Sequence, residues 1–540
     1  MFTYQSEEFT GDEIAVLNRH FTNLDRPVFA LVNLPEVVKG ALFARYSRSS
    51  KSLRRLFLDE FAGALALPAA GGGDGEEGDV GLDRAERLYE KVFVEYGDDS
   101  VAQLGGVHLA CEQASNLLTK LLEWGRLASY LEQSTRYIPY DVRANGRFRY
   151  YRDPGILTSR LGARYVGDMD EMFDAYSSLL PVLGDHFRRV HPKDADDSDF
   201  VYRQSIRAKS FDALRGLLPA AAQSNVGIYG SGQAYEAMLL RMRAHPLPEA
   251  RAYADEMLFE LRKVIPSFLK RVDVPDRGGA WSDYLSTNRS AMSGVAQRLF
   301  DGRVDAVPEA SVRLVDWDPD AEVKMIAAML APHTHLSDTT LLDEVAAMGA
   351  ADRKSVVAAY VGQRSNRRHK PGRGLERVNY RFEIVADYGA FRDLQRHRMM
   401  TIEWQNLTPH HGYLRPTEVD DAGAAAAYDQ AMATSAGLHD VLARQFPDRA
   451  SYAVALGYRV RFTMNLNARE AMHLTELRSA PQGHASYRTV AQDMHRAIAE
   501  VAGHRLVADM MSFVDHGSGV ELERLEAERR AEARRERPTS

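Results

Sequence analysis

Hydrophobic residues recur every three to four positions through much of this chain, which is the spacing of an amphipathic helix. The longest such run covers residues 164–190 and contains Pro181. Shorter runs of the same kind predict helices at 36–58, 84–96, 233–243, 249–270, 321–331, 338–349 and 353–361. Strand-like alternation occurs at 378–386, and residues 147–151 predict a second short strand. We therefore expect an α+β fold that is rich in helix and has modest sheets.

Two stretches interrupt these patterns. Residues 68–81 are rich in glycine and acidic residues and predict a surface loop. Residues 272–300 mix proline, glycine, aspartate, serine and asparagine with little periodicity, which predicts a domain boundary. Because 540 residues are too many for one ordinary core, we expect at least two domains. Residues 521–537 are a run of Glu and Arg that predicts a solvated helix.

Composition narrows the class of protein. Hydrophobic residues at 45%, charged residues at 26% and a net charge of −7 give no bulk reason to expect a nucleic-acid partner. The single cysteine, Cys111, excludes an internal disulfide and a cysteine-based zinc site, and we expect no metal centre. No apolar run approaches the roughly 18 residues that span a bilayer, and the start lacks a cationic signal-peptide region. We expect a cytoplasmic protein with no membrane partner.

Candidate chemistry first appears in the run that ends Glu132-Gln133-Ser134-Thr135-Arg136-Tyr137. Ser134 and Arg136 flank one small residue, so a hydroxyl, backbone N–H groups and a guanidinium could converge on an oxyanion such as a phosphate. The same residue types also occur in ordinary polar loops with one surface arginine. The motif alone does not separate these alternatives.

Three further segments carry candidate groups. Arg215 precedes Gly216-Leu217-Leu218-Pro219, and the triplet Arg396-His397-Arg398 follows the predicted strand at 378–386. In the run 467–478, Arg469 and His473 share one helical face, and Leu474 with Arg478 form the neighbouring stripe. Each has an ordinary alternative: a helix-surface arginine, a solvated basic face, and a partly buried helix histidine.

Together these motifs resemble the signatures of the flavin-dependent thymidylate synthases (ThyX), and the resemblance occurs twice. The first copy, at about 36–268, keeps the Glu-x-Ser-x-Arg element and Arg215, with Thr135 where the family has Gly. The second copy, at about 340–512, keeps Arg-His-Arg and the Asn-Ala-Arg helix. The chain departs from the family in three places. Trp124-Gly125 stands where the family has Arg-His, and Ser451 stands at the second-copy position that corresponds to Arg215. Leu121 and Asp393 each stand where the family has a pyrimidine-recognising Gln. Each copy has thus lost motifs that the other keeps.

The resemblance implies an α+β architecture of two fused ThyX-like domains, each helix-rich with a modest sheet. We place the N-terminal domain at 1–271, a linker with connecting helices at 272–339, the C-terminal domain at 340–515 and a charged tail at 516–540. Because family active sites are assembled between protomers, one composite site could be built from both copies. Family tetramers also make a homodimer of tandem chains, a pseudo-tetramer, the expected assembly.

The resemblance also implies site residues. The nucleotide-binding set is Glu132, Ser134, Thr135, Arg136, Arg215 and Arg478. The cofactor-binding set is Arg396, His397, Arg398, Asn467, Arg469 and His473. The implied reaction is reductive methylation of dUMP to dTMP, with methylenetetrahydrofolate and NADPH as co-substrates and FAD as cofactor. We assign no catalytic acid or base. The alternatives are a flavin- or nucleotide-binding relative that is catalytically degenerate or acts on another substrate, and a purely structural protein.

Overall fold

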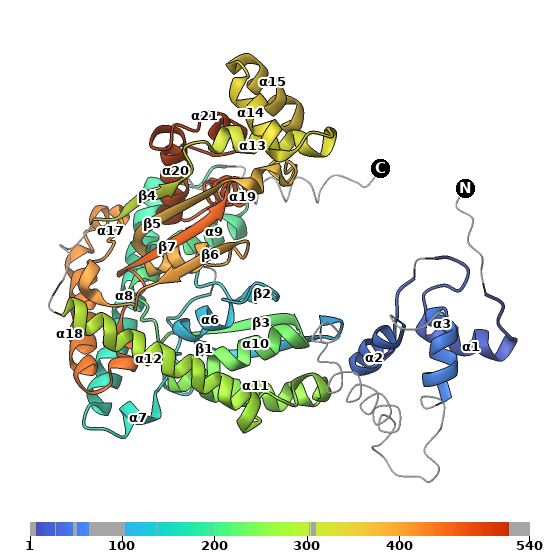
Figure 1. The fold of residues 1–540 in the computed structure, drawn as a ribbon. Helices are drawn as coiled ribbons and strands as arrows, with labels where there is room; N and C mark the ends of the chain where they lie inside the picture. Colours follow the sequence, from blue (N-terminus) through green and yellow to red (C-terminus); the bar gives the residue numbers. More distant parts are fainter. Residues whose placement is uncertain are drawn as a thin grey trace, which may run out of the picture. The chain divides into compact units, whose positions relative to one another are not determined.

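The computed structural model describes residues 7–63 and 103–517, apart from residues 28, 47–50, 137, 196, 302 and 304–308. It divides into two compact units (Figure 1). Unit 1 contains residues 1–111, 127–131 and 226–302, and unit 2 contains 112–126, 132–225 and 303–540. The predicted loop at 68–81 and helix at 84–96 lie outside the described residues, as does the charged tail.

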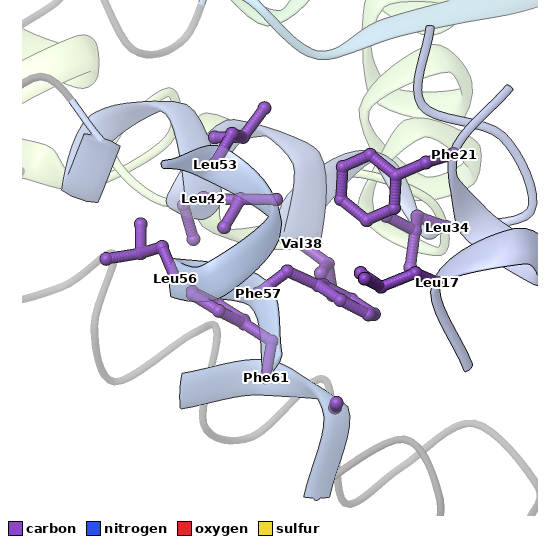
Figure 2. Packing of buried hydrophobic residues seen from close by; sticks show 11 residues of the cluster. Leu17, Phe21, Leu34, Val38, Leu42, Leu53, Leu56, Phe57 and Phe61 are labelled. Carbon is purple, nitrogen blue, oxygen red and sulfur yellow. The ribbon is translucent and has the colours of Figure 1, made fainter. Parts of the chain in front are cut away.

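The N-terminal part of unit 1 is a small helical cluster. It consists of α1 (Gly11–His20), α2 (Glu36–Tyr46), α3 (Leu53–Phe57) and a π-helical turn, η1 (Leu58–Ala62). A capping box between Thr10 and Glu13 starts α1. Figure 2 shows the apolar side chains that these helices share, among them Leu17, Val38 and Phe57. The predicted helix at 36–58 is therefore two helices.

The rest of unit 1 contains strand segments, described with the sheets below, and three long helices. These are α10 (Gly232–Arg243), α11 (Pro248–Arg262) and α12 (Ala280–Phe300). Helix α11 ends earlier than the prediction of 249–270, before a short 3-10 turn at Pro266–Leu269. Helix α12 lies within the segment 272–300, which was predicted as a domain boundary. It is mostly exposed to solvent, which explains why its sequence shows no apolar stripe.

Unit 2 contains a four-stranded antiparallel sheet in the order β4-β5-β7-β6, with β4 at Ser311–Trp317, β5 at Asn379–Asp387, β6 at Met400–Trp404 and β7 at Arg459–Asn467. Strand β5 confirms the strand predicted at 378–386. In register, Phe382 pairs with Met464 and Ile384 with Phe462, and all four side chains are buried. Residues 147–151, predicted to be a strand, make only isolated bridges.

Long helices pack around this sheet in unit 2. Helix α8 (Gly162–Val190) confirms the predicted helix at 164–190, with Pro181 inside it. It contacts both α9 (Asp199–Leu214) and α18 (Ala425–Gln445). Helices α13 (Ala321–Leu330), α14 (Asp338–Ala347) and α15 (Ala350–Val361) match the predicted helices within a few residues. The remaining long elements are α19 (Ala468–Arg478), α20 (Ala485–Glu500) and α21 (Arg505–Met510).

The two copies repeat one topology. In the first, β1 (Gly106–Ser115), α6 (Asn116–Leu122) and β2 (Ser129–Glu132) are followed later by β3 (Gln223–Ser231) and α10. In the second, β5, α16 (Tyr388–Leu394) and β6 are followed later by β7 and α19. The first sheet has the order β1-β3-β2 and the second contains β5-β7-β6, so the last strand of each copy lies in the middle. Each strand-to-helix junction carries an N-cap side chain, from Ser115, Ser231, Asp387 and Asn467.

A second sign of duplication lies within unit 2, where segment 216–221 pairs with segment 452–457. The backbone bonds come in exchanged pairs: Ala220 N to Val454 O (2.8 Å) with Leu456 N to Leu218 O (2.9 Å), and Ala221 N to Tyr452 O (3.0 Å) with Gly457 N to Gly216 O (2.8 Å). Exchanging the two segments reproduces the same pattern, as in an isologous interface between identical subunits. The chain is thus a tandem of two related α+β copies, as the sequence predicted.

Candidate functional site

The phosphate-binding motif predicted in the first copy lies directly after β2, in unit 2. The Ser134 Oγ accepts a hydrogen bond from the Arg136 backbone N–H at 3.2 Å, and Thr135 is buried. The Arg136 guanidinium reaches α9, where its Nε and Nη2 donate to both carboxylate oxygens of Asp212 at 2.7 and 2.6 Å. Such a bidentate pair fixes the plane of the guanidinium.

Arg136 also contacts the second copy. Its Nη1 donates to the Tyr487 hydroxyl at 3.1 Å and its Nη2 donates to the Gln482 carbonyl oxygen at 3.2 Å. The guanidinium of Arg478, at the end of α19, lies over the same Tyr487 ring at 5.5 Å from its centroid. One aromatic side chain therefore links the two arginines that the sequence assigns to opposite copies.

A carboxylate that the sequence analysis treated only as a departure from the family, Asp393, stands at the centre of this region. Arg215 Nη1 lies 3.4 Å from its Oδ2, and Arg478 Nη1 and Arg396 Nη1 lie 3.6 and 3.9 Å from its Oδ1. Burial alone would raise the pKa of Asp393, but the charges of Arg215, Arg478, Arg136 and Arg396 lower it below the usual aspartate value. Asp393 is therefore ionised at neutral pH. We name Arg136, Arg215, Arg396 and Arg478 the arginine cluster.

Arg215 is the most buried member of the arginine cluster, at 4% exposure. It begins the short 3-10 turn after α9, and its Nη2 lies 4.0 Å from Asp387 and has no hydrogen-bond partner within the described part of the chain. Its guanidinium lies against the backbone of Gly389 in α16, where an added Cβ would be 3.1 Å from both Nε and Nη2. A small residue at position 389 therefore makes room for the buried guanidinium.

Glu132, which the motif predicts to contact the nucleotide, lies between two buried cations. Its two carboxylate oxygens accept hydrogen bonds from Arg392 at 2.7 Å and from Lys120 at 3.1 Å, and all three side chains are buried. Lys120 also bonds Glu123. Burial would raise the pKa of Glu132, but Arg392 and Lys120 lower it, whereas burial dominates at Glu123 and raises the pKa of that group. Both oxygens of Glu132 are thus occupied by protein cations.

The second-copy motifs form a chain of hydrogen bonds behind Arg478. Arg478 Nε donates to His397 Nε2 at 3.1 Å, and His397 Nδ1 lies 2.7 Å from Glu470. Burial lowers the pKa of His397 to about 4, and the bonds from both histidines lower the pKa of Glu470 to about 2 despite its own burial. His397 is therefore neutral, with its proton on Nδ1, and it orients Arg478 toward Asp393. His473 lies 3.5 Å from the other Glu470 oxygen.

Two other predicted cofactor ligands, Asn467 and Arg469, lie at the start of α19. Asn467 caps the helix by accepting from Glu470 N at 2.9 Å, and Arg469 Nε donates to the Pro371 carbonyl at 3.0 Å. The Arg396, Arg469 and His473 side chains are 34%, 36% and 31% exposed, and Arg398 is exposed. These donors are open enough to solvent to contact a polyanionic ligand.

Two residue groups could also hold a metal ion. The ligating atoms of His397, Glu470 and His473 lie within 4.8 Å of one another, as do those of His410, His439 and Asp440. In the first group the hydrogen bonds described above already engage these atoms. We assign no metal to either.

A cavity of about 540 Å³ opens in unit 2 on the other side of Arg136. Its lining includes Asp212, Asp387 and His484, together with apolar side chains such as Val385 and Val490. His484 Nε2 lies 3.3 Å from the Asp212 carbonyl oxygen, and burial and Arg215 lower its pKa to about 4, so it is neutral at pH 7. Arg136 thus belongs to both the arginine cluster and the wall of a space large enough for a small molecule.

The positions related to the arginine cluster by the duplication have lost their charges. Ser451, the counterpart of Arg215, donates to the Leu407 carbonyl oxygen at 2.7 Å. Trp124, the counterpart of Arg396, packs edge-on against Trp404 with ring centroids 5.4 Å apart. The duplication gives two equivalent positions for such a cluster, and the arginines lie at the position around Asp393.

Sequence reasoning did not identify Asp212, Tyr487, His484 or the pair Lys120 and Arg392. None of them lies in a motif with a chemical spacing, and their partners are distant in sequence. Asp393 was noticed only because it replaces a family residue, and nothing in the sequence indicated that three arginines would surround it.

The fold and this arrangement define a class of protein: a tandem α+β chain in which arginines from both copies lie close together around a carboxylate. The chain belongs to the thymidylate synthase complementing protein family (Thy1), whose model matches residues 46–267 and again residues 313–503. This agrees with the resemblance seen in the motifs and with its occurrence twice in the chain.

The chain is also similar to individual proteins. A UPF0159 protein of Chlamydia pneumoniae is 40% identical over 98% of this chain and 99% of its own length. The flavin-dependent thymidylate synthase of Clostridium tetani is 25% identical over 33% of this chain and 67% of its own. The solved structure of ThyX from Helicobacter pylori, complexed with FAD and dUMP, is 17% identical, covers 36% of this chain and 99% of its own, and has a TM-score of 0.27. Within the ranges that the structure describes, no helix has the length and apolar character to cross a bilayer.

Proposed function

We propose that this chain binds a pyrimidine nucleoside monophosphate, with dUMP as the expected ligand, and methylates it in a flavin-dependent reaction. The observation that carries the proposal is the convergence of Arg215, Arg396 and Arg478, from three separate segments, around Asp393, with Arg136 close enough to lower the pKa of the same carboxyl. Guanidinium groups bind phosphate oxygens in pairs, and one such hydrogen bond is worth about 1.5–3 kcal/mol. Three of them suffice for micromolar affinity.

The rest of the nucleotide would lie in the cavity beside Arg136. Its volume of about 540 Å³ is within the range of small-molecule pockets, and its wall combines apolar side chains with polar groups. The Asp212 pair holds Arg136 at the boundary between the cavity and the arginine cluster. Arg136 would therefore orient the phosphate relative to the base.

FAD would be held by Arg396, Arg398, Arg469 and His473, and it would supply the redox chemistry that methyl transfer from methylenetetrahydrofolate requires. The residues of this chain contribute binding and orientation. His397 is neutral and accepts from Arg478, so it keeps that guanidinium turned toward the anion site. Asn467 and Glu470 fix the start of α19, which carries both His473 and Arg478. We assign no proton transfer to a specific side chain.

A second candidate function is favoured by one observation. Arg136, Arg215, Arg396 and Arg478 all lie within ion-pair distance of a carboxylate of the protein, which is not the arrangement of a vacant phosphate site. The chain could therefore act on a different nucleotide or bind one without turnover. Tritium release from dUMP labelled at C5, in the presence of NADPH and methylenetetrahydrofolate, separates the two functions.

Binding tests the proposal directly. Arg136→Lys and Arg478→Lys keep the charge but lose the planar pair of donors, so each should raise the Kd for dUMP by tenfold or more. Arg143→Lys is the matched control, because Arg143 is an exposed arginine of unit 2 that pairs with Asp170 and Asp174. Unchanged calorimetric titrations for both cluster variants would contradict a composite nucleotide site.

A further inference from the structure

The contacts of Asp393 differ in kind from the other ion pairs nearby. Arg136 and Asp212 form a close bidentate pair at 2.6–2.7 Å. The three arginines around Asp393 stay 3.4–3.9 Å from its oxygens, and only the Arg215 contact has hydrogen-bond geometry. One small carboxylate is thus shared among three guanidinium groups without a close fit to any.

The carboxylates around the arginine cluster leave one donor unused. The four guanidinium groups lie near the carboxylates of Asp212, Asp387 and Asp393, and Arg478 is linked through His397 to Glu470. Asp387 is committed elsewhere as well, because it caps α16 and accepts from Ser486. Among the described residues, the buried Nη2 of Arg215 has no hydrogen-bond partner. The site therefore retains one unused buried donor, which favours an anion with more acceptor oxygens than a carboxylate.

The position of Asp393 in its helix is also unfavourable. It lies in the last turn of α16, where the helix dipole disfavours a negative charge. The side chain keeps 18% of its surface, so its carboxylate has a route toward solvent. What holds the side chain inward is the arginine cluster itself.

We propose that Asp393 is a built-in competitor for the phosphate: it holds Arg215, Arg396 and Arg478 in the free protein and yields them to a phosphate monoester dianion. The exchange replaces one negative charge by two, so the three arginines face a larger opposite charge than Asp393 supplies. A monoanion would gain nothing from the exchange, since it brings no more charge than the carboxylate it displaces. Asp393 would thus select phosphate monoesters over phosphodiesters and carboxylates. The natural ligand rests on the proposed function above, but the role of Asp393 does not.

An ordinary structural counter-ion would behave in the opposite way. If Asp393 only organised the arginines, its removal would loosen them and weaken anion binding. If it competes, Asp393→Asn should tighten binding, because the amide keeps the shape and loses the charge. Removing one negative charge about 5 Å from a bound phosphate corresponds to a Kd roughly 100-fold lower or more at an effective dielectric constant of about 20.

The experiment compares full-length wild type, Asp393→Asn and Asp212→Asn by calorimetry with dUMP, inorganic phosphate and the methyl ester of dUMP, a monoanion. We expect Asp393→Asn to bind all three anions more tightly and to lose most of the preference for dUMP over its methyl ester. Asp212→Asn is the matched control, since it removes a carboxylate that orients Arg136 and should weaken binding. Weaker or unchanged binding by folded Asp393→Asn overturns the proposal.

Wild type alone provides a test if Asp393→Asn fails to fold. Its Kd for dUMP should be at least tenfold lower than its Kd for the methyl ester, and equal values contradict the competitor role. Tighter phosphate binding by Asp393→Asn without measurable dUMP binding supports the role of Asp393 and contradicts the proposed nucleotide function. Turnover of dUMP by wild type, with no tighter binding by Asp393→Asn, supports the nucleotide function and contradicts the role of Asp393. No anion binding by either protein contradicts both.

Discussion

Glu132 offers a sharp test, because its motif assigns it to the nucleotide whereas its contacts assign it to the core. Its carboxylate is 4% exposed and lies between Lys120 and Arg392. Replacing it by Gln leaves Lys120 paired with Glu123 and takes away the carboxylate that pairs with the buried Arg392. Removing one partner of a buried pair costs about 3–5 kcal/mol, because the remaining charge stays desolvated. We expect Glu132→Gln to lower the free energy of unfolding of unit 2 by that amount.

Glu123 is the matched control for this variant. It contacts the same Lys120 and its side chain is 1% exposed, but burial raises its pKa, so it resembles a neutral acid more than Glu132 does. Glu123→Gln should therefore cost about 1 kcal/mol or less, the value of an ordinary hydrogen bond. Both variants replace a buried acid that contacts Lys120, and they differ little in side-chain volume.

Acid should reduce the difference in stability between wild type and Glu132→Gln. The pKa of Glu132 is lowered in the folded state from 4.5, so its stabilising contribution is complete above pH 4.5 and declines as the pH falls below that value. Differential scanning calorimetry from pH 7 to pH 3.5 would show a difference in Tm on the order of 5–10 °C at pH 7 that shrinks at low pH. Equal losses for Glu132→Gln and Glu123→Gln, or a difference that grows in acid, would refute this account of Glu132.

Two further predictions concern the same unit. Gly389→Ala places a Cβ 2.9 Å from Asp387 Oδ1 and 3.1 Å from the Arg215 guanidinium, so it should raise the Kd for dUMP several-fold. The control is Gly437→Ala, whose Cβ meets nothing closer than 3.8 Å and which should leave the Kd unchanged. Equal Kd values for the two variants would contradict the role of Gly389. His397 and His484 both have a pKa lowered to about 4, chiefly by burial, from 6.5 in the unfolded chain. Protonation of each histidine should therefore lower the free energy of unfolding by up to about 3 kcal/mol as the pH falls from 6.5 to 4. His397→Asn should make the free energy of unfolding, measured in urea, depend less steeply on pH. An unchanged dependence on pH would contradict this account of His397.

Much of the secondary structure was predictable from local patterns. The apolar stripe of α8 and the alternation of β5 are direct consequences of helix and strand geometry, so the sequence alone located both. The exposed helix α12 was missed because it has little apolar face to bury. The duplication was recognised from motifs, and the repeated strand order of the two sheets agrees with it.

The candidate site also combines features that the sequence determined with features that the tertiary structure decided. The sequence determined which chemical groups each copy retains: the hydroxyl and guanidinium of Ser134 and Arg136 in the first, and the imidazole and guanidinium of His397 and Arg478 in the second. Only the tertiary structure decided their partners, because the environment of a charge depends on which distant segments pack beside it. Glu132 became part of a buried ion network, and Asp393 came to lie among three arginines. Local spacing cannot encode either outcome, since the cost of burying a charge is set by neighbours that are remote in sequence.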